Sequence, residues 1–447
     1  MEPFEITNAN REPGRNIART MGLLATSTEA HPNEVRVLVY GQSISKQLWW
    51  LKVKHWLQAT YPHAKLVMEN WAIGGFHATR LLACAEHDVR LFYPDLVLFH
   101  DYGPQDDYEA IIRAIRRTTT AEIAIQTDHV AVGQNEGWHD AHAFEWLPAL
   151  CDRYGLELVD VRRNWQRHLA QTGLAAQDLL SDHVHLNDAG NALMAAIVSA
   201  HLVQSAAYGP DPQGLTSLLR LGVDFVPGSE ITVAFDGNRV DLIDAARLDA
   251  AVLIDGQPPS AHGGSYVAER PWLDRSWPPK VGVPVRIDLG ERPESDRWSL
   301  RVREVLDDGA EVRFELHSER HGFDGAGTSA ADFVSQSGRI AIPRTAWFVR
   351  EETGFFAMLP AVGVDERIPV ARPKSVPAAT AEPVRFDPVV ATVPWPARQV
   401  RAPHPAGRAA PGSRRRCRPI ASPSTRQRCR LRRPNSSARI QGSHGSI

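Results

Sequence analysis

The sequence predicts an α/β domain with a mostly parallel sheet, followed by a strand-rich domain and a basic C-terminal tail. Three observations lead to this organisation. Short β-branched apolar runs alternate with helical patterns between residues 35 and 207. Strand patterns with few helical ones follow from about 215 to 370, and the last 77 residues are rich in Arg and Pro. Alternating strands and helices imply βαβ units, whose parallel sheets are covered by helices on both faces.

The elements of the first domain are predicted from the spacing of apolar residues. The predicted strands are 35–40, 64–69, 95–100, 122–126 and 156–161. The predicted helices are 45–60, a segment following Gly75 through residue 82, 108–117, 141–154, and one that starts near Asn187. Ser45 can cap the first helix, Tyr61-Pro62 ends it, and Gly155 ends the fourth.

The second domain is predicted to be an antiparallel β-sandwich, because few helical patterns separate its strands. The predicted strands are 230–235, 239–243, 251–254, 298–302, 311–316 and 339–342, with hairpin turns at 236–238 and 307–309. Trp272, Trp277 and Phe323 with Asp324-Gly325 could line a sugar-binding platform or pack within a core. The predicted organisation is an N-terminal extension (1–32), an α/β domain (33–207), a β-sandwich (215–370) and a tail (371–447).

The formal net charge of -2 hides a division between the body of the chain and the tail. From residue 371 onward, 15 Arg and one Lys face only Glu382 and Asp387, so the tail carries +14 and the rest −16. The tail also holds 12 of the 32 prolines and shows no strand or helix period. We therefore expect it to be disordered.

Three interpretations of the tail stay open. Its composition is typical of an out-of-frame translation of a GC-rich gene, and a linker is a second possibility. A nucleic-acid arm is less favoured, because no aromatic residues interleave with the Arg run to stack on bases.

Several classes of protein are excluded or disfavoured by composition. With 43% hydrophobic residues the chain can bury cores. No run of about 18 apolar residues occurs, so no transmembrane helix is expected, and the first 20 residues lack the apolar region of a signal peptide. Four scattered cysteines suit neither a disulfide framework nor a zinc site. A reducing, cytoplasmic setting is expected.

Candidate catalytic residues follow the predicted strands, where ligands of parallel sheets bind. Ser43 follows the first strand, and Asp182 and His185 precede the last helix. A serine, a histidine base and an orienting acid form an activated nucleophile. The backbone N–H groups of Ser43 and Gly75 could stabilise an oxyanion. Each residue alone has an ordinary alternative as a cap or turn; the ordered placement of all of them favours catalysis.

Three segments resemble the conserved blocks of the SGNH, or GDSL, hydrolases. These are Gly41-Gln42-Ser43-Ile44-Ser45, Asn70-Trp71-Ala72-Ile73-Gly74-Gly75, and the segment from Asp182 through His185 to Gly190. Gln42 stands where the family usually has Asp. The resemblance covers about residues 33–205. It implies a three-layer α/β/α fold, Ser43 as nucleophile, His185 as base with Asp182 as its partner, and Gly75 in the oxyanion hole.

The third block of the family departs from the pattern. Where the family has Gly-x-Asn-Asp, this chain has Gly103-Pro104-Gln105-Asp106. Gln105 could supply an amide N–H to the oxyanion, one methylene longer than Asn. If the strand sets the alignment instead, Pro104 takes the position and offers no donor. Loss of such a donor costs on the order of 10²–10³ in rate.

Other polar residues near the strand ends are assigned to the substrate. Asp101, Tyr102, Asp128 and His129 are predicted to bind it, with internal hydrogen bonding as the alternative. His100 could shape the same pocket or act as a second base. Glu136, His139, Asp140 and His142 match no strong metal-site signature, so neither a metal nor a cofactor is expected.

These features together predict a serine ester hydrolase, with removal of O-acyl (acetyl) groups from a carbohydrate as the favoured reaction. The expected partner is a small-molecule or glycan ester, with no membrane or nucleic acid. The alternative is a catalytically decayed SGNH-fold protein that binds glycans, which the missing Asn and the strand-rich domain favour.

Overall fold

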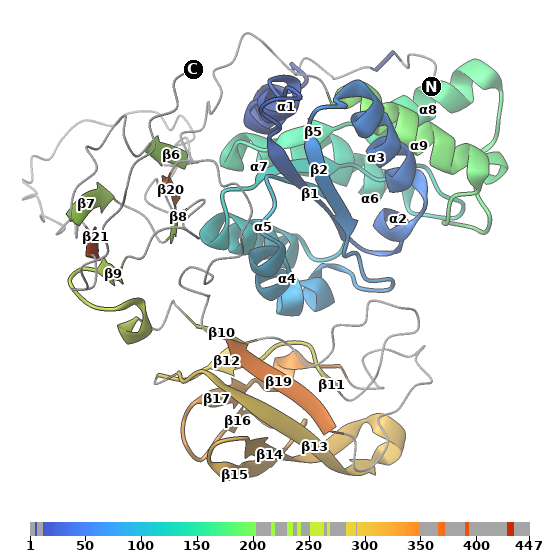
Figure 1. Ribbon diagram of the computed structural model, residues 1–447. Coiled ribbons are helices and arrows are strands. Elements are labelled where there is room, and N and C mark those ends of the chain that lie inside the picture. Colours follow the sequence, from blue (N-terminus) through green and yellow to red (C-terminus); the bar gives the residue numbers. More distant parts are fainter. Residues whose placement is uncertain are drawn as a thin grey trace, which may run out of the picture.

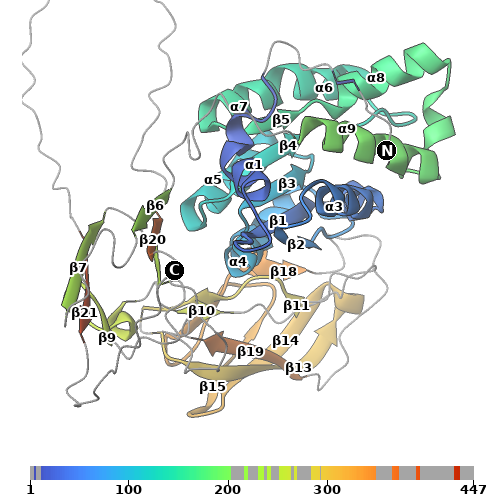
Figure 2. The ribbon, with the colours of Figure 1, turned by 45° about the horizontal axis from the view of Figure 1, so that its top comes forward.

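The computed structural model describes most of the first 202 residues and a series of later segments. The described residues are 5–6, 12–202, 216–219, 230–235, 239–242, 251–262, 266–268, 283–291, 293–348, 365–371, 389–392 and 427–432. The first strands are β1 (Glu34–Gly41), β2 (Lys65–Asn70), β3 (Leu96–His100), β4 (Glu122–Gln126) and β5 (Glu157–Val159). They pair in parallel in the order β2-β1-β3-β4-β5 (Figure 1 and Figure 2). The predicted α/β fold with a parallel sheet is confirmed.

Helices connect and flank these strands. They are η1 (Arg15–Ile17), α1 (Ala18–Ala25), α2 (Ser43–Lys46), α3 (Trp49–Thr60), α4 (Ala78–Phe92), α5 (Gln105–Thr118), α6 (Glu136–Ala141), the π-helical η2 (His142–Trp146), α7 (Leu147–Tyr154), α8 (Val161–Thr172), η3 (Ala176–Leu179) and α9 (Asp188–His201). The predicted helix 45–60 is broken, because Gln47 takes an extended conformation between α2 and α3. The fifth strand ends early, because the Asp160 side chain caps α8.

Helices cover both faces of the sheet and give it two apolar cores. Val35, Val37 and Val39 of β1 pack in one core with residues of α1, α3, α8 and α9. Leu38 and Tyr40 pack in the other core with residues of α4, α5 and α7. Because successive side chains point to opposite faces of a strand, a strand buried on both faces must be apolar throughout. This accounts for the continuous apolar runs in the sequence.

The N-terminal segment belongs to the α/β unit, which corrects the predicted start of that domain at residue 33. Ile17, Met21 and Leu24 are buried in the same core as β1. The buried carboxylate of Glu157 accepts the backbone N–H groups of Gly14 and Asn16, each at 2.8 Å. Residues 12–32 therefore complete the amino end of the sheet. The segment escaped prediction because α1 is only eight residues long and contains a glycine.

The later strands form antiparallel sheets. The main group comprises β10 (Val267–Ala268), β11 (Val283–Pro284), β12 (Asp288–Leu289), β13 (Asp296–Leu306), β14 (Glu311–Ser318), β15 (Gly322–Thr328), β16 (Phe333–Val334), β17 (Ile340–Ile342), β18 (Trp347–Phe348) and β19 (Asp365–Ala371), with the short helical turns η5 (Pro259–Ala261), η7 (Asp307–Gly309) and η8 (Arg344–Ala346). In the sheet β10-β19-β13-β14-β15, residues of β10, β13 and β14 share one apolar core with β17 and the segment around Trp347. The predicted antiparallel strands of this part are confirmed, as is the 307–309 hairpin between β13 and β14.

Two further sheets include strands from the predicted tail. They are built from β6 (Thr216–Leu219), β7 (Glu230–Phe235), β8 (Arg239–Leu242), β9 (Ala251–Ile254), β20 (Val389–Thr392) and β21 (Gln427–Arg432), in the orders β6-β20-β8 and β7-β21-β9. The predicted turn at 236–238 lies outside the described residues, and the strands on either side of it, β7 and β8, lie in different sheets. Within 371–447, where the sequence predicts a disordered tail, the structure describes β20 and β21. β20 is rich in β-branched residues, and β21 alternates Arg with Cys429 and Leu431, which suits a strand. The rest of 371–447 lies outside the described residues.

The β-rich part contacts the α/β unit beside α4. Val283 and Val285 are buried in the apolar cluster that contains residues of α4 and α5, and Figure 2 shows β11 and β18 on the side that faces α4. The predicted division at 207–215 falls on residues outside those described, so these domain limits stay a proposal. Within the described segments, no helix has the length and apolar character that would let it span a bilayer.

Candidate active site

Ser43 lies just beyond the carboxyl end of β1, as the sequence predicts. It is the first residue of α2, and Gln42 before it caps that helix by accepting the Ile44 N–H. Gly41 has φ +139°, and a Cβ atom at this position would lie 1.9 Å from the carbonyl oxygen of His100. Only glycine lets the ends of β1 and β3 approach this closely, so Gly41 sets where Gln42 and Ser43 stand.

The structure brings Ser43, His185 and Asp182 together in one hydrogen-bonded chain. Ser43 Oγ is 3.0 Å from His185 Nε2, and His185 Nδ1 is 2.8 Å from Asp182 Oδ2. If the Nδ1–H of His185 donates to the carboxylate, Nε2 is left to accept the serine proton. The three residues are 142 and 3 positions apart in the chain, so the fold is required to close this arrangement.

Asp182 has two functions in its loop. Its Oδ1 accepts the backbone N–H groups of His185 at 2.7 Å and Val184 at 2.8 Å, while Oδ2 faces the imidazole. The backbone N–H of His185, with smaller contributions from Val184 and the imidazole, holds the pKa of Asp182 well below its usual range. The carboxylate is therefore ionised wherever the histidine can act as a base.

Side chains from distant elements hold the loop that carries His185. The N–H of Leu186 donates to Gln47 Oε1 at 2.8 Å, and His129 Nε2 donates to the carbonyl of Val184 at 2.8 Å. Burial lowers the pKa of His129 to about 4, so this imidazole is neutral at neutral pH. His129, which the sequence predicts to bind substrate, is buried in the structure and anchors the loop that carries His185. The break at Gln47, which sequence reasoning missed, frees that side chain for the same task.

The structure places Gly75 and Gln105, the two predicted oxyanion residues besides Ser43, in different surroundings. The N–H of Ile73 donates to the carbonyl of Gly41 at 3.0 Å, which carries the segment toward Gly75 past the end of β1. Gly75 has φ +73°, in the left-handed region. Gln105, by contrast, is exposed at the first residue of α5 and, within the part of the chain described, makes no hydrogen bond to Ser43, His185 or Asp182. Its assistance to the oxyanion stays a prediction.

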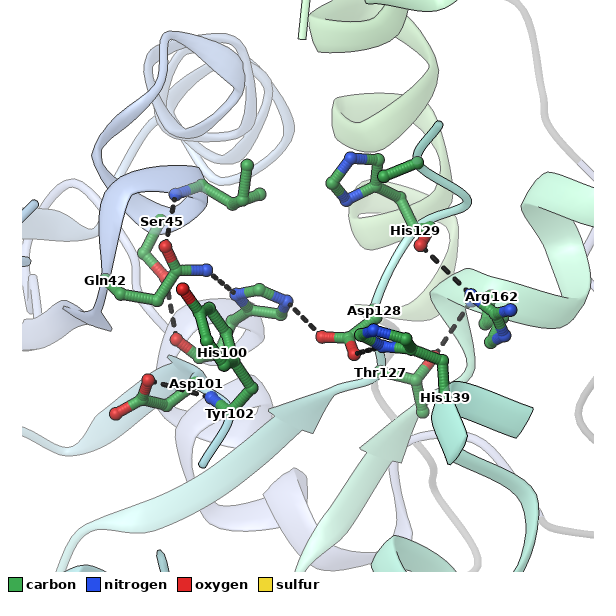
Figure 3. Close-up of polar contacts among 12 residues, drawn as sticks. Gln42, Ser45, His100, Asp101, Tyr102, Thr127, Asp128, His129, His139 and Arg162 are labelled. Atoms are coloured by element: carbon green, nitrogen blue, oxygen red, sulfur yellow. Dashed lines mark hydrogen bonds and ion pairs between the residues drawn. The ribbon is translucent and has the colours of Figure 1, made fainter. Parts of the chain in front are cut away.

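A buried polar chain behind Ser43 links Gln42, His100, Asp128 and His139 (Figure 3). Ser43 Oγ lies 2.7 Å from Gln42 Oε1, and Gln42 Nε2 lies 3.2 Å from His100 Nδ1. His100 Nε2 is 3.0 Å from Asp128 Oδ1, and His139 Nδ1 is 2.5 Å from Asp128 Oδ2. Both oxygens of Asp128 are thus occupied by imidazoles, so this residue, predicted to bind substrate, serves an internal network. The sequence motifs around Ser43 and Gly75 did not indicate this hydrogen-bonded network.

Asp101 and Tyr102, the other predicted substrate residues, follow β3 directly. Tyr102 is 42% exposed and is free to face a ligand. Asp101 is buried, and its Oδ1 accepts the N–H of Tyr102 at 2.8 Å. Burial raises the pKa of Asp101 well above its usual range, and the negative charge of Asp128 acts in the same direction. In the described residues, no group of three His, Cys, Asp or Glu side chains is arranged to hold a metal ion.

We expect Asp101→Asn to stabilise the protein, and more so at high pH. The unfolded carboxyl titrates near pH ~3.9, whereas the folded one keeps its proton to higher pH. As pH rises through this window, the unfolded state loses its proton first, so Asp101 increasingly favours unfolding. The neutral Asn lacks this penalty. Thermal unfolding at pH 4 and pH 8 tests the expectation; an equal change in Tm at both values contradicts it.

Comparisons with known proteins give structural likenesses only. No protein-family model matches the sequence, and no curated protein does. The acetylxylan esterase Axe2 from Geobacillus stearothermophilus is 20% identical, with 39% of this chain and 98% of that chain covered and a TM-score of 0.34. The acetyl xylan esterase AlAXEase is 19% identical (38% and 100% covered, TM-score 0.33). LAE5, an alpha/beta hydrolase from the metagenome of Lake Arreo, Spain, is 18% identical (40% and 100%, TM-score 0.34).

Proposed function

We propose that this protein is a serine ester hydrolase of the SGNH type. The observation that carries the proposal is the chain from Ser43 Oγ through His185 to Asp182, with contacts of 3.0 Å and 2.8 Å. The residue types, their order and their distances are those of an activated nucleophile. Ionised Asp182 fixes the imidazole so that its free nitrogen faces the serine.

The reaction follows from this geometry. Ser43 Oγ attacks the ester carbonyl while its proton passes to His185 Nε2, and Asp182 stabilises the imidazolium that forms. The N–H groups of Ser43 and Gly75 are the proposed donors to the oxyanion. The tetrahedral intermediate collapses to an acyl-enzyme, and His185 returns the proton to the departing alcohol. Water then attacks the acyl group by the same path, which releases the acid and restores Ser43.

An O-acyl group on a carbohydrate is the proposed substrate. The side chains of His185 and Asp182 are 37% and 46% exposed, so the triad lies at the surface, where a bulky alcohol can remain outside. Tyr102 and Trp138 are also exposed, at 42% and 39%. Aromatic faces of this kind pack well against sugar rings. Acetylated sugars and short p-nitrophenyl esters are therefore the substrates to test.

A fluorophosphonate probe tests the nucleophile directly. We expect it to label Ser43 and to leave Ser45, which is buried two residues away, unmodified; peptide mass spectrometry locates the adduct. Asp182→Asn is expected to slow labelling and ester hydrolysis by about 10²–10⁴, because the imidazole loses its orienting anion. Hydrolysis without labelling of Ser43 refutes the mechanism. Glycan binding with neither labelling nor hydrolysis favours the decayed binding protein.

A further inference from the structure

The buried chain behind Ser43 has a fixed direction of hydrogen bonding. The side chains of His100 and Asp128 are only 2% and 8% exposed. Burial alone would raise the pKa of Asp128, but the hydrogen bonds from His100 and His139 outweigh it and the pKa is lowered. An ionised carboxylate accepts only, so the proton of His100 must sit on Nε2.

This tautomer determines how the Gln42 amide is oriented. With its proton on Nε2, the Nδ1 of His100 can only accept, and the group facing it at 3.2 Å is the amide N–H of Gln42. The amide oxygen then faces the other way, where it accepts the Ile44 N–H at 3.2 Å and lies 2.7 Å from Ser43 Oγ. If the amide were rotated, its oxygen would face the acceptor Nδ1 of His100, and its N–H₂ group would face the donor N–H of Ile44.

The oriented amide bears on the nucleophile itself. Ser43 Oγ donates its single proton to Gln42 Oε1 at 2.7 Å, and His185 Nε2, which takes that proton when the serine reacts, lies 3.0 Å from the same oxygen. A partly exposed serine side chain at the start of a helix can take several rotamers, and only some of them face His185. The contact with Gln42 selects the rotamer that does so. Near-attack geometry of this kind is worth large factors in rate.

We propose that Asp128 and His100 are positioning residues that fix the Gln42 amide, and that this amide holds Ser43 Oγ within reach of His185. The proposal rests on the proposed function of Ser43. In this proposal the second histidine–carboxylate pair, His100 and Asp128, acts neither as the base nor as a ligand of the substrate.

Two substitutions of His100 separate positioning from packing. In His100→Asn the amide oxygen can occupy the place of Nδ1 and still accept from Gln42. In His100→Gln the amide N–H can occupy the place of Nε2, which keeps the bond to Asp128 and loses the acceptor for Gln42. We expect His100→Gln to lower kcat about tenfold or more with KM unchanged, and His100→Asn to restore most of that loss. Equal losses in both variants, or no loss in either, overturn the proposal.

A matched pair elsewhere serves as the control. His201 Nε2 is 2.6 Å from Glu157 Oε1, both side chains are buried, and Glu157 begins β5 at the end of the sheet opposite Ser43. His201→Asn and His201→Gln should lower Tm without changing kcat. A Ser43→Ala variant run alongside keeps the two ideas apart: hydrolysis by that variant removes the proposed function, whatever the His100 variants do.

Gln42→Met decides the question if the His100 variants fail to fold. It keeps the length of the side chain and removes both its donor and its acceptor. We expect kcat to fall about tenfold while KM and the circular dichroism spectrum stay the same. An unchanged or higher kcat overturns the proposal, because Gln42 would then be a spectator or a competitor for the serine proton.

Discussion

Ser43→Ala is expected to lower kcat/KM for p-nitrophenyl acetate by a factor on the order of 10⁴–10⁶, to the residual rate that binding and oxyanion donors supply. The reason is that no other hydroxyl lies within hydrogen-bond distance of His185 Nε2 among the described residues. The fold should persist, because the change removes one oxygen from a partly exposed position. Initial rates and a thermal melt on the same preparation measure both effects.

The control for this variant is the retention of substrate. Ser43→Ala should still bind an acetylated oligosaccharide, and the fluorophosphonate adduct should disappear. Hydrolysis at the rate of the unmodified protein would refute Ser43 as the nucleophile. Loss of both hydrolysis and the cooperative melt would show that the change had unfolded the protein, in which case the Asp182→Asn variant carries the test.

Gly41→Ala is expected to combine a loss of stability with a loss of activity. The added Cβ would meet the His100 carbonyl oxygen at 1.9 Å and Ser45 Oγ at 2.7 Å, at a φ of +139° that side-chain-bearing residues rarely adopt. Because backbone cannot yield as a flexible side chain does, the ends of β1 and β3 must separate. We expect about 2–4 kcal/mol less stability and a kcat reduced roughly 10²-fold, as the nucleophile shifts from His185.

Gly173→Ala is the matched control for that prediction. Gly173 caps α8 with φ +71°, but a Cβ there meets nothing within 4 Å. It should cost only the backbone strain, about 1–2 kcal/mol, and leave kcat unchanged. Chemical denaturation and steady-state kinetics on both variants give the comparison. If Gly41→Ala is no more harmful than Gly173→Ala, then the close approach of β1 and β3 is not what places the nucleophile.

Local sequence patterns predicted the features that depend on neighbouring residues, which are the strands and the residues at their ends. The strands of the sheet follow from short apolar runs, and Ser43, Asp182 and His185 follow from residue types at the ends of predicted elements. The break between α2 and α3 could not be predicted, because the apolar spacing continues across Gln47 and the partner of the Gln47 side chain, the N–H of Leu186, is 139 residues away. The anchoring role of His129 likewise depends on a carbonyl 55 residues away.

The network behind Ser43 shows the same limit more sharply. Gln42 appears in the sequence only as a departure from a family motif, and His100 and His139 as polar residues near strand ends. Their relation exists only once β1, β3 and the segment after β4 are side by side. Sequence spacing cannot reveal an amide whose orientation is decided by the tautomer of a histidine 58 residues away.

The N-terminal segment stabilises the amino end of the sheet, whereas Ser43 lies at the carboxyl end. Glu157 and Glu122 are buried at the amino ends of β5 and β4, where the backbone N–H groups of residues 14–20 satisfy them. A chain that began at residue 33 would leave two acids buried without these donors, and such groups are costly. The smallest part of the α/β unit that folds on its own is therefore expected to include residues 12–32, although they lie at the end of the sheet opposite Ser43. The donors that these buried acids need, rather than the positions of Ser43, Asp182 and His185, set its limits.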